Sequence, residues 1–88
     1  MTLRFTNKFL KQAGKFQNTK MGKEILLIIE QAEKATSVHN LKGVKKLAGF
    51  KTFYRIRIGD YRLGLNLAGN ILEFVTFDHR KDIYKYFP

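Results

Sequence analysis

The sequence has no cysteine, a single proline and only two histidines among its 88 residues. The absence of cysteine excludes disulfide scaffolds, thiolate zinc sites and cysteine nucleophiles. Two histidines are too few for the usual metal cages, so we expect neither a bound metal nor another cofactor. No stretch of about 18 apolar residues is present, and the N-terminus lacks the apolar segment of a signal peptide. We therefore expect a cytoplasmic protein, not associated with a membrane, in which residues 1–88 form one domain.

Acidic residues are also scarce, with 7 Asp and Glu against 17 Lys and Arg, which gives a formal net charge of +10. Hydrophobic residues make up 44% of the chain, enough for a packed core, so the charge does not indicate disorder. Such an excess of positive charge predicts an anionic partner: nucleic acid, an acidic protein or an anionic membrane surface.

The scarcity of acidic residues also limits the chemistry. They form no cluster that could hold the two metal ions of a metal-dependent nuclease, and no glycine-rich nucleotide-binding loop is present. An enzyme of this composition that cleaves phosphodiesters would have to act without metal. That restricts its substrate to RNA, whose 2′-hydroxyl can attack the adjacent phosphate.

The apolar pattern of the first half predicts a short strand followed by two helices. Residues 2–5 alternate as in a strand, and Thr6 is placed to cap a helix that carries Phe9 and Phe16. A second helix is expected to stop near residues 35–37, where β-branched and small polar residues accumulate. Its buried stripe has helical spacing and consists of Met21, Ile25, Ile28, Ile29 and Ala32.

From residue 53 the period changes to two, which predicts strands connected by Gly-Asp and Gly-Asn turns. The predicted strands are residues 53–58, 61–67 and 71–78. Residues 44–48 could add a further short strand, and the tail 80–86 reads as a short helix or turn. We expect an α+β fold in which two N-terminal helices pack on a mostly antiparallel four-stranded sheet.

A two-residue turn at Gly59-Asp60 places Arg57 opposite Arg62, and Arg55 opposite Gly64, on the face directed away from the core. Like charges directly opposite each other destabilise a sheet by up to about 1 kcal/mol, and nothing on this face supplies a neutralising carboxylate. We interpret this arginine face, made of Arg55, Arg57 and Arg62, as an anion site, with room left beside Arg55 by the absence of a side chain at Gly64. A plain solvated face is the alternative.

The last strand ends in His79-Arg80, which the order of the strands places close to Arg62. A histidine can exchange a proton near neutral pH, and an arginine can stabilise the charge that develops on a phosphate in the transition state. Tyr84 could stack on a base. The alternatives are an ordinary surface histidine and a tail aromatic that packs on the core.

Two segments resemble the RelE/ParE toxin superfamily of bacterial type II toxin–antitoxin systems. Residues 46–63 read KLAGFKTFYRIRIGDYRL and contain a leucine-glycine segment followed by a YRxRxGDYR hairpin. Residues 79–84 read HRKDIY and match the ending HRxDxY. The order of the predicted elements also matches, so the resemblance extends over essentially the whole chain.

The resemblance implies an mRNA interferase, an endoribonuclease that cuts mRNA in the ribosomal A site, inhibits translation and is silenced by a cognate antitoxin. Arg55 and Arg57 match the basic pair before the hairpin turn in the RelE branch, and Arg62 matches its phosphate-binding arginine. Arg80 matches the transition-state arginine, and Tyr84 the tyrosine that stacks on the substrate base.

His79 resembles the histidine that some ribosome-dependent relatives use as a general acid or base. It is the only conventional base available, because arginine does not readily lose its proton and no residue matches the glutamate of some relatives. The predicted catalytic residues are Arg62, His79, Arg80 and Tyr84, and the predicted RNA phosphate-binding residues are Arg55, Arg57 and Arg62, with no metal. The ParE branch, which inhibits DNA gyrase without a nuclease site, is the alternative, as is a degenerate member that only binds antitoxin.

Overall fold

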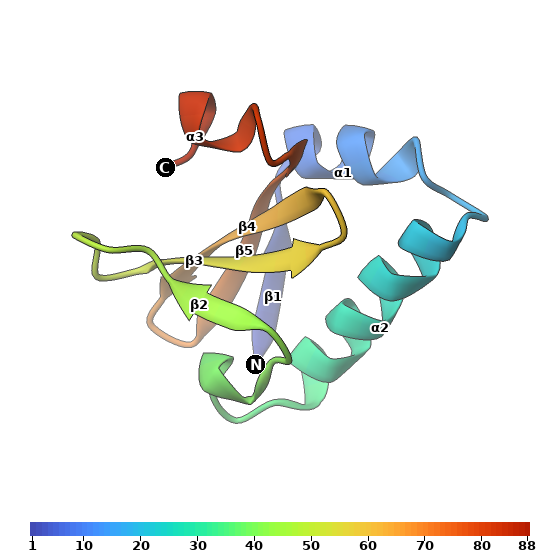
Figure 1. The fold of residues 1–88 in the computed structure, drawn as a ribbon. Coiled ribbons are helices and arrows are strands. Elements are labelled where there is room, and N and C mark those ends of the chain that lie inside the picture. Colours follow the sequence, from blue (N-terminus) through green and yellow to red (C-terminus); the bar gives the residue numbers. More distant parts are fainter.

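The computed structural model describes all residues, Met1–Pro88, and is organised around one five-stranded sheet (Figure 1). The strands are β1 (Thr2–Phe5), β2 (Val44–Lys46), β3 (Phe53–Ile58), β4 (Tyr61–Ala68) and β5 (Ile71–His79). Their order in the sheet is β1-β5-β4-β3-β2, and only the β1–β5 pair is parallel. The predicted α+β class is confirmed. The sheet has five strands rather than the expected four, because Val44–Lys46, within the segment 44–48 that could add a strand, does form one.

Three α-helices accompany the sheet. They are α1 (Asn7–Gly14), α2 (Lys20–Lys34) and α3 (Ile83–Tyr86), and a 3-10 turn, η1 (Val38–Asn40), leads into β2. As predicted, Thr6 caps α1: its hydroxyl accepts the N–H of Phe9 at 3.0 Å and donates to the carbonyl of Val75 in β5 at 2.6 Å. One side chain therefore both starts α1 and ties it to the sheet.

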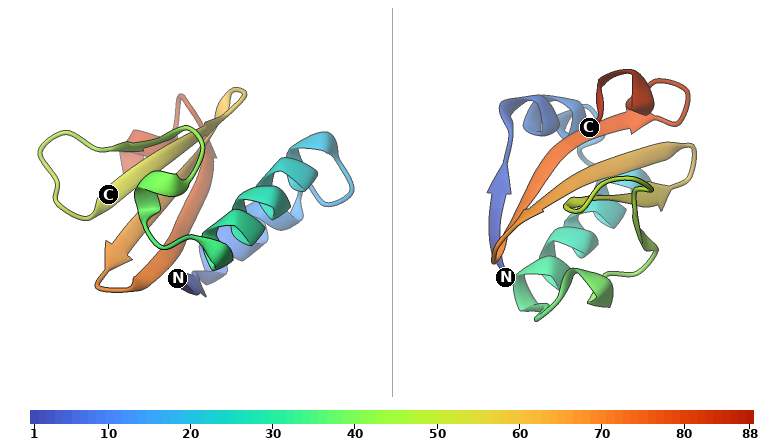
Figure 2. Two further views of the ribbon diagram at one scale, coloured as in Figure 1. Left: turned by 90° about the horizontal axis from the view of Figure 1, so that it is seen from below. Right: turned by 90° about the vertical axis from the view of Figure 1, so that its left-hand side faces the viewer.

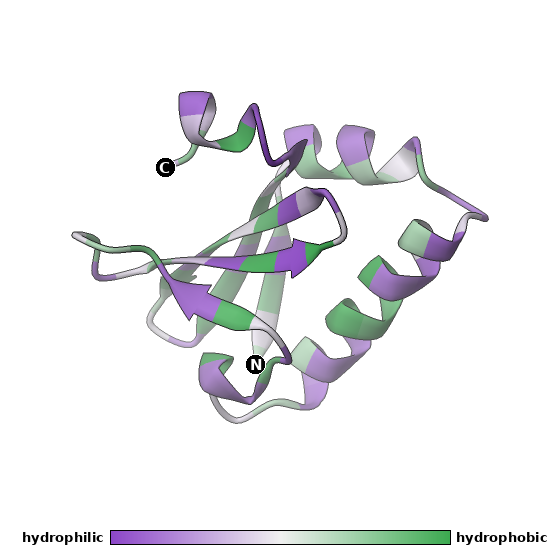
Figure 3. Cartoon of the chain, viewed as in Figure 1, coloured by the Kyte–Doolittle hydropathy of each residue, from purple (hydrophilic) through white to green (hydrophobic).

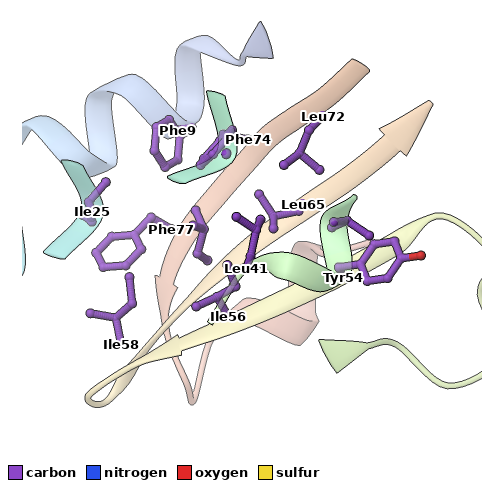
Figure 4. Close-up of a cluster of buried hydrophobic side chains, with 13 residues drawn as sticks. Phe9, Ile25, Leu41, Tyr54, Ile56, Ile58, Leu65, Leu72, Phe74 and Phe77 are labelled. Atoms are coloured by element: carbon purple, nitrogen blue, oxygen red, sulfur yellow. The ribbon is translucent and has the colours of Figure 1, made fainter. Parts of the chain in front are cut away.

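The core lies between the sheet and the two N-terminal helices (Figure 4). On the strands the buried apolar side chains include Tyr54, Ile56, Ile58, Leu63, Leu65, Leu72, Phe74 and Phe77. The helices contribute Phe9, Ile25 and Ala32 to the same cluster. Burying one such large side chain stabilises the fold by roughly 1.5–3 kcal/mol, so the alternation along β3 fixes which face meets the helices.

The opposite face of the sheet presents polar residues and is approached by the C-terminus. Figure 3 shows hydrophilic and hydrophobic residues alternating along β3. In Figure 2, α2 and α3 lie on opposite sides of the sheet. The register of the β3–β4 hairpin is the predicted one, with Arg57 opposite Arg62 and Arg55 opposite Gly64.

The pairing of β4 with β5 contains an irregularity that the sequence did not predict. Gly64 lies opposite Thr76, but Leu65 lies opposite Phe74, so Val75 is an extra residue on β5. A bulge of one residue reverses the alternation of side chains beyond it. As a result Thr76 turns to the arginine face, although Phe74, two residues earlier, points into the core.

Candidate functional site

The arginine face exists as predicted and carries one further cation. Arg55 and Arg57 of β3 and Arg62 of β4 share the face opposite the helical core. Lys45 pairs with Arg55 in the β2–β3 register and joins the same face. The sequence analysis missed Lys45 because it lies on the three-residue strand β2, where no periodicity can assign a face.

The pKa of Arg62 is affected by several of the predicted site residues. Desolvation, followed by the charges of Arg57 and Arg55, lowers the pKa of Arg62 below its ordinary value. Tyr84 acts in the opposite direction, and Arg80 lowers the pKa further. Four other predicted residues are thus close enough to act on Arg62, and the balance of their effects on its charged form is unfavourable. A bound anion would relieve this repulsion.

The guanidinium of Arg62 is held over the hairpin turn by its own backbone neighbours. Its Nη1 donates to the carbonyls of Gly59 at 2.9 Å and Tyr61 at 2.8 Å. Because a guanidinium has five N–H donors, those on Nε and Nη2 are left for an outside acceptor. This geometry suits bidentate contact with a phosphate.

The same turn also positions Arg80. The backbone N–H of Arg80 donates to the carbonyl of Asp60 at 2.7 Å, which places Arg80 directly beside the β3–β4 turn. Its Nε lies 3.8 Å from Oδ1 of Asp60, and both side chains are more than half exposed. Exposed pairs of this kind contribute only about 0–1 kcal/mol, so Asp60 leaves Arg80 available for a stronger anion.

A carboxylate does lie on this face, contrary to the expectation that none would. The bulge in β5 brings Asp78 opposite Arg62. The Asp78 carboxylate accepts hydrogen bonds from the Gln12 amide and the Thr76 hydroxyl, and Oε1 of Gln12 accepts the N–H of Phe77 at 2.9 Å. Asp78 makes no ion pair with Arg62. Its hydrogen bonds serve to attach α1 to β5.

His79 is not brought onto the arginine face. It pairs with Tyr61, whose side chain points toward the helices, and the two rings are 5.4 Å apart. Nδ1 of His79 accepts the N–H of Lys81 at 3.1 Å. The same bulge that turns Asp78 toward Arg62 turns His79 away from it, so the role of His79 in proton transfer stays a prediction.

The short helix α3 presents Tyr84 to solvent. The buried side chains of Ile83 and Phe87 anchor α3 to the sheet, and Tyr84 between them is 56% exposed. Tyr84 therefore does not pack into the core, which was the alternative interpretation of a tail aromatic. Its charge acts to raise the pKa of Arg62, so the Tyr84 side chain lies near enough to that guanidinium to interact with it.

The open space expected at Gly64 is absent. A Cβ atom at Gly64 would lie 3.0 Å from two ring carbons of Phe87 and 2.9 Å from Cγ2 of Thr76. The absence of a side chain at Gly64 therefore allows the Phe87 ring to lie against β4. Because Phe87 fills this space, an anion would have to bind over the arginines and not in a hollow beside Arg55. The expectation was wrong because the sequence pattern of a hairpin does not show what the chain end will cover.

The fold was compared with the requirements of a metal site and of a membrane-spanning helix. No three His, Cys, Asp or Glu side chains gather in a way that could hold a metal ion. None of the helices has the length and apolar character required to cross a bilayer.

Comparison with known proteins gives a consistent result, although no protein-family model matches the sequence. The toxin RelE3 of Methanocaldococcus jannaschii is 45% identical over 67 residues, which are 75% of this chain and 76% of that protein. A chain of the RelB–RelE antitoxin–toxin complex from Methanococcus jannaschii superimposes with a TM-score of 0.79 at 37% identity, covering 97% of this chain and 99% of that one.

More distant structures share the fold. The YoeB dimer from Staphylococcus aureus has a TM-score of 0.70 at 16% identity, over 90% of this chain and 95% of that one. YafQ from E. coli has a TM-score of 0.68 at 15% identity, over 93% and 96%. The resemblance found in the hairpin and the C-terminal motif is thereby confirmed, and the chain belongs to the RelE family of toxins.

Proposed function

We propose that residues 1–88 form a single toxin domain of a type II toxin–antitoxin system, which cleaves mRNA in the ribosomal A site and so inhibits translation. The observation that carries the proposal is the convergence of Arg55, Arg57, Arg62, Arg80 and Tyr84 on one exposed surface. Desolvation, together with the charges of the neighbouring arginines, lowers the pKa of Arg62, and no carboxylate forms an ion pair with the arginines of β3 and β4. A surface of this kind is suited to a polyanion such as RNA.

In the proposed reaction the RNA itself supplies the nucleophile. The 2′-oxygen forms a bond to the adjacent phosphorus while the bond from phosphorus to the 5′-oxygen breaks, leaving a 2′,3′-cyclic phosphate and a 5′-hydroxyl. Negative charge accumulates on the phosphoryl oxygens in the transition state, where Arg62 and Arg80 would donate hydrogen bonds. Arg55 and Arg57 would hold the scissile phosphate, and Tyr84 would stack on a base.

Two protons must also move, one from the 2′-hydroxyl and one to the 5′-oxygen. His79 is the proposed group, and its Nε2 is the free ring nitrogen because Nδ1 accepts the N–H of Lys81. The arginine cluster supports phosphate binding, whereas His79 lies on the opposite face of β5. The two roles therefore need separate tests.

The shape of the surface supports a role for the ribosome. A hollow of about 520 Å³ lies between α1 and α2 on the helical side, and a second of about 360 Å³ is lined by residues of α2 and Gly59, so neither is at the arginines. An exposed site outside these two hollows offers little to orient a flexible RNA, and correct orientation contributes much of the rate in such reactions. We propose that the ribosome holds the mRNA in position while the toxin supplies the charged groups.

A cognate antitoxin is the second proposed partner. The RelE relative from Methanococcus jannaschii was solved as a RelB–RelE antitoxin–toxin complex. With a net charge of +10, this chain would attract an acidic antitoxin segment that covers the arginines and blocks RNA. In this proposal both partners are met in the cytoplasm.

The test uses purified protein and a defined mRNA, with and without programmed ribosomes, and maps the cleaved ends. Removing one transition-state donor typically slows an enzyme by 10²–10³-fold, so we expect Arg62→Ala and Arg80→Ala each to lose roughly that much activity. Arg4→Ala is the matched control, because Arg4 is a strand arginine opposite Glu73 on the far edge of the sheet.

His79→Ala is measured in the same assay. A loss comparable to that of the arginine variants would support proton transfer by His79, and wild-type activity would remove it from the site. If Arg62→Ala and Arg80→Ala both cleave like the wild type, the assignment of the site is wrong. Intact mRNA together with inhibited DNA supercoiling would replace the proposal by a gyrase-directed toxin.

A further inference from the structure

The loop between β2 and β3 carries an exposed phenylalanine at one end of the arginine face. Phe50 retains 45% exposure, and the loop projects beyond the sheet (Figures 1 and 2). The loop is nevertheless tied down by backbone hydrogen bonds, from Leu47 to the carbonyl of Phe53 at 2.9 Å and from Phe50 to that of Leu47 at 3.2 Å. Phe50 is therefore presented in a defined position.

A row of rings leads from Phe50 to the middle of the arginine face. The ring centroid of Phe50 is 5.7 Å from that of Phe53 at an interplanar angle of 85°, and Phe53 is 5.4 Å from Phe87 at 87°. Phe87 in turn covers Gly64, whose partner across the β3–β4 ladder is Arg55. Edge-to-face packing of this kind fixes each ring against the next.

The exposed large apolar side chains fall into two chemical groups. The aliphatic ones, Leu10, Leu26 and Leu27, lie on helices α1 and α2. The aromatic ones, Phe50, Tyr84 and Tyr86, lie in the β2–β3 loop and in α3. Aliphatic helix surfaces are typical of protein contacts, whereas exposed aromatic rings beside arginines are typical of single-stranded RNA recognition.

The spacing along β3 suits a nucleic acid strand. Phe53 and Arg55 are alternate residues on the same face, which separates them by about 6.7 Å along the strand. That distance is close to the length of one extended nucleotide. A phosphate bound at Arg55 therefore brings the next base of the strand toward Phe53, and the exposed ring of Phe50 lies 5.7 Å from Phe53, within reach of the same base.

We propose that Phe50 stacks on an RNA base next to the cleaved phosphate, at the end of the arginine face away from the hairpin turn. Tyr84, beside Arg62, would hold a base at the other end, so that two aromatic platforms bracket the phosphate. The inference rests on the proposed function and extends it, because it assigns a second base-binding position that would influence which sequences are cut.

The experiment measures binding of a short fluorescent single-stranded RNA that carries one 2′-deoxynucleotide at the cleavage position, so that it cannot be cut. Phe50→Ala is compared with Phe50→Leu, which keeps an apolar side chain without a ring, and with Phe50→Trp. Stacking changes affinity by roughly 5- to 150-fold per base. We expect about 10-fold weaker binding for the alanine and leucine variants and near wild-type binding for tryptophan. Leu27→Ala, which removes an exposed apolar side chain from α2, is the matched control.

Cleavage of unmodified mRNA on programmed ribosomes supplies the second measurement, in which Phe50→Ala should alter the nucleotide preference beside the cut. Wild-type binding by Phe50→Ala or by Phe50→Leu would overturn the inference. So would a loss confined to the affinity for a cognate antitoxin. In each case the proposed function survives if Arg62→Ala is still inactive. Failure of the unaltered protein to bind and cleave RNA would overturn both.

Discussion

Replacing Arg57 by glutamine should make the folded protein more stable while it impairs RNA binding. Arg57 and Arg62 lie directly opposite each other in the β3–β4 ladder, and the charge of Arg57 contributes to the lowered pKa of Arg62. A folded-state pKa below the unfolded value means that the charged form of Arg62 is disfavoured by folding. Glutamine is shorter and uncharged, and because Arg57 is exposed it removes this repulsion with little loss of packing.

The expected gain follows from the cross-strand geometry. Directly opposed like charges destabilise a sheet by about 0.2–1 kcal/mol, and the exposure of Arg57 with the partial exposure of Arg62 suggests about 0.5 kcal/mol. For a domain of this size, such a gain corresponds to a rise in Tm of roughly 2–4 °C. Arginine loses its proton only in strongly alkaline solution, so the gain should be constant between about pH 5 and pH 9.

Ionic strength is the condition that should change the result. The Debye length falls from about 10 Å at 0.1 M salt to about 3 Å at 1 M, so the gain should shrink in concentrated salt. Thermal and urea denaturation of the wild type and Arg57→Gln at both salt concentrations test this. Arg57→Lys keeps the charge and should gain nothing, and Arg4→Gln, opposite Glu73, should lose a little stability. A destabilised Arg57→Gln, or a gain unaffected by salt, would refute the reasoning.

Three further substitutions test the packing around the site. Gly64→Ala places a methyl group 3.0 Å from the Phe87 ring, so we expect a loss of about 1–3 kcal/mol, seen as a lower Tm; an unchanged Tm would contradict the packing described for the C-terminus. Thr6→Ala removes the cap of α1 and should cost about 1 kcal/mol in urea denaturation, with Thr6→Ser recovering most of it. Gln12→Ala leaves the N–H of Phe77 without an acceptor and removes one of the two donors to the Asp78 carboxylate, so we expect a loss of about 1–3 kcal/mol by the same measurement.

The parts of the site that were predictable from the sequence are those set by short-range rules. Gly59 has a φ of +58° and starts a two-residue turn, which fixes the register of β3 and β4 and with it the opposition of Arg57 and Arg62. The capping hydroxyl of Thr6 likewise located the start of α1. Local conformation decided these features, and a local pattern was sufficient to find them.

The parts that were missed depend on contacts made far along the chain. The bulge at Val75 leaves no signature in the apolar pattern, yet it decides that Asp78 shares the face of Arg62 and that His79 does not. Lys45 was missed because three residues carry no measurable period. A bulge changes little in the sequence pattern but moves every side chain beyond it to the other face of the sheet. A three-residue strand is too short for the pattern to assign its side chains to a face.

The parallel pairing of β1 with β5 determines when the sheet can be completed during synthesis. Thr2–Phe5 are synthesised well before their partners Ile71–Phe74, so β1 cannot pair until β5 has been made. Arg80 follows later still. A chain interrupted between Arg62 and the start of β5 would contain Arg62 without β5 or Arg80. Its sheet would lack the strand that separates β1 from β4. We therefore expect chains that stop before β5 to be harmless, because the complete sheet and Arg80 exist only after β5 has been made.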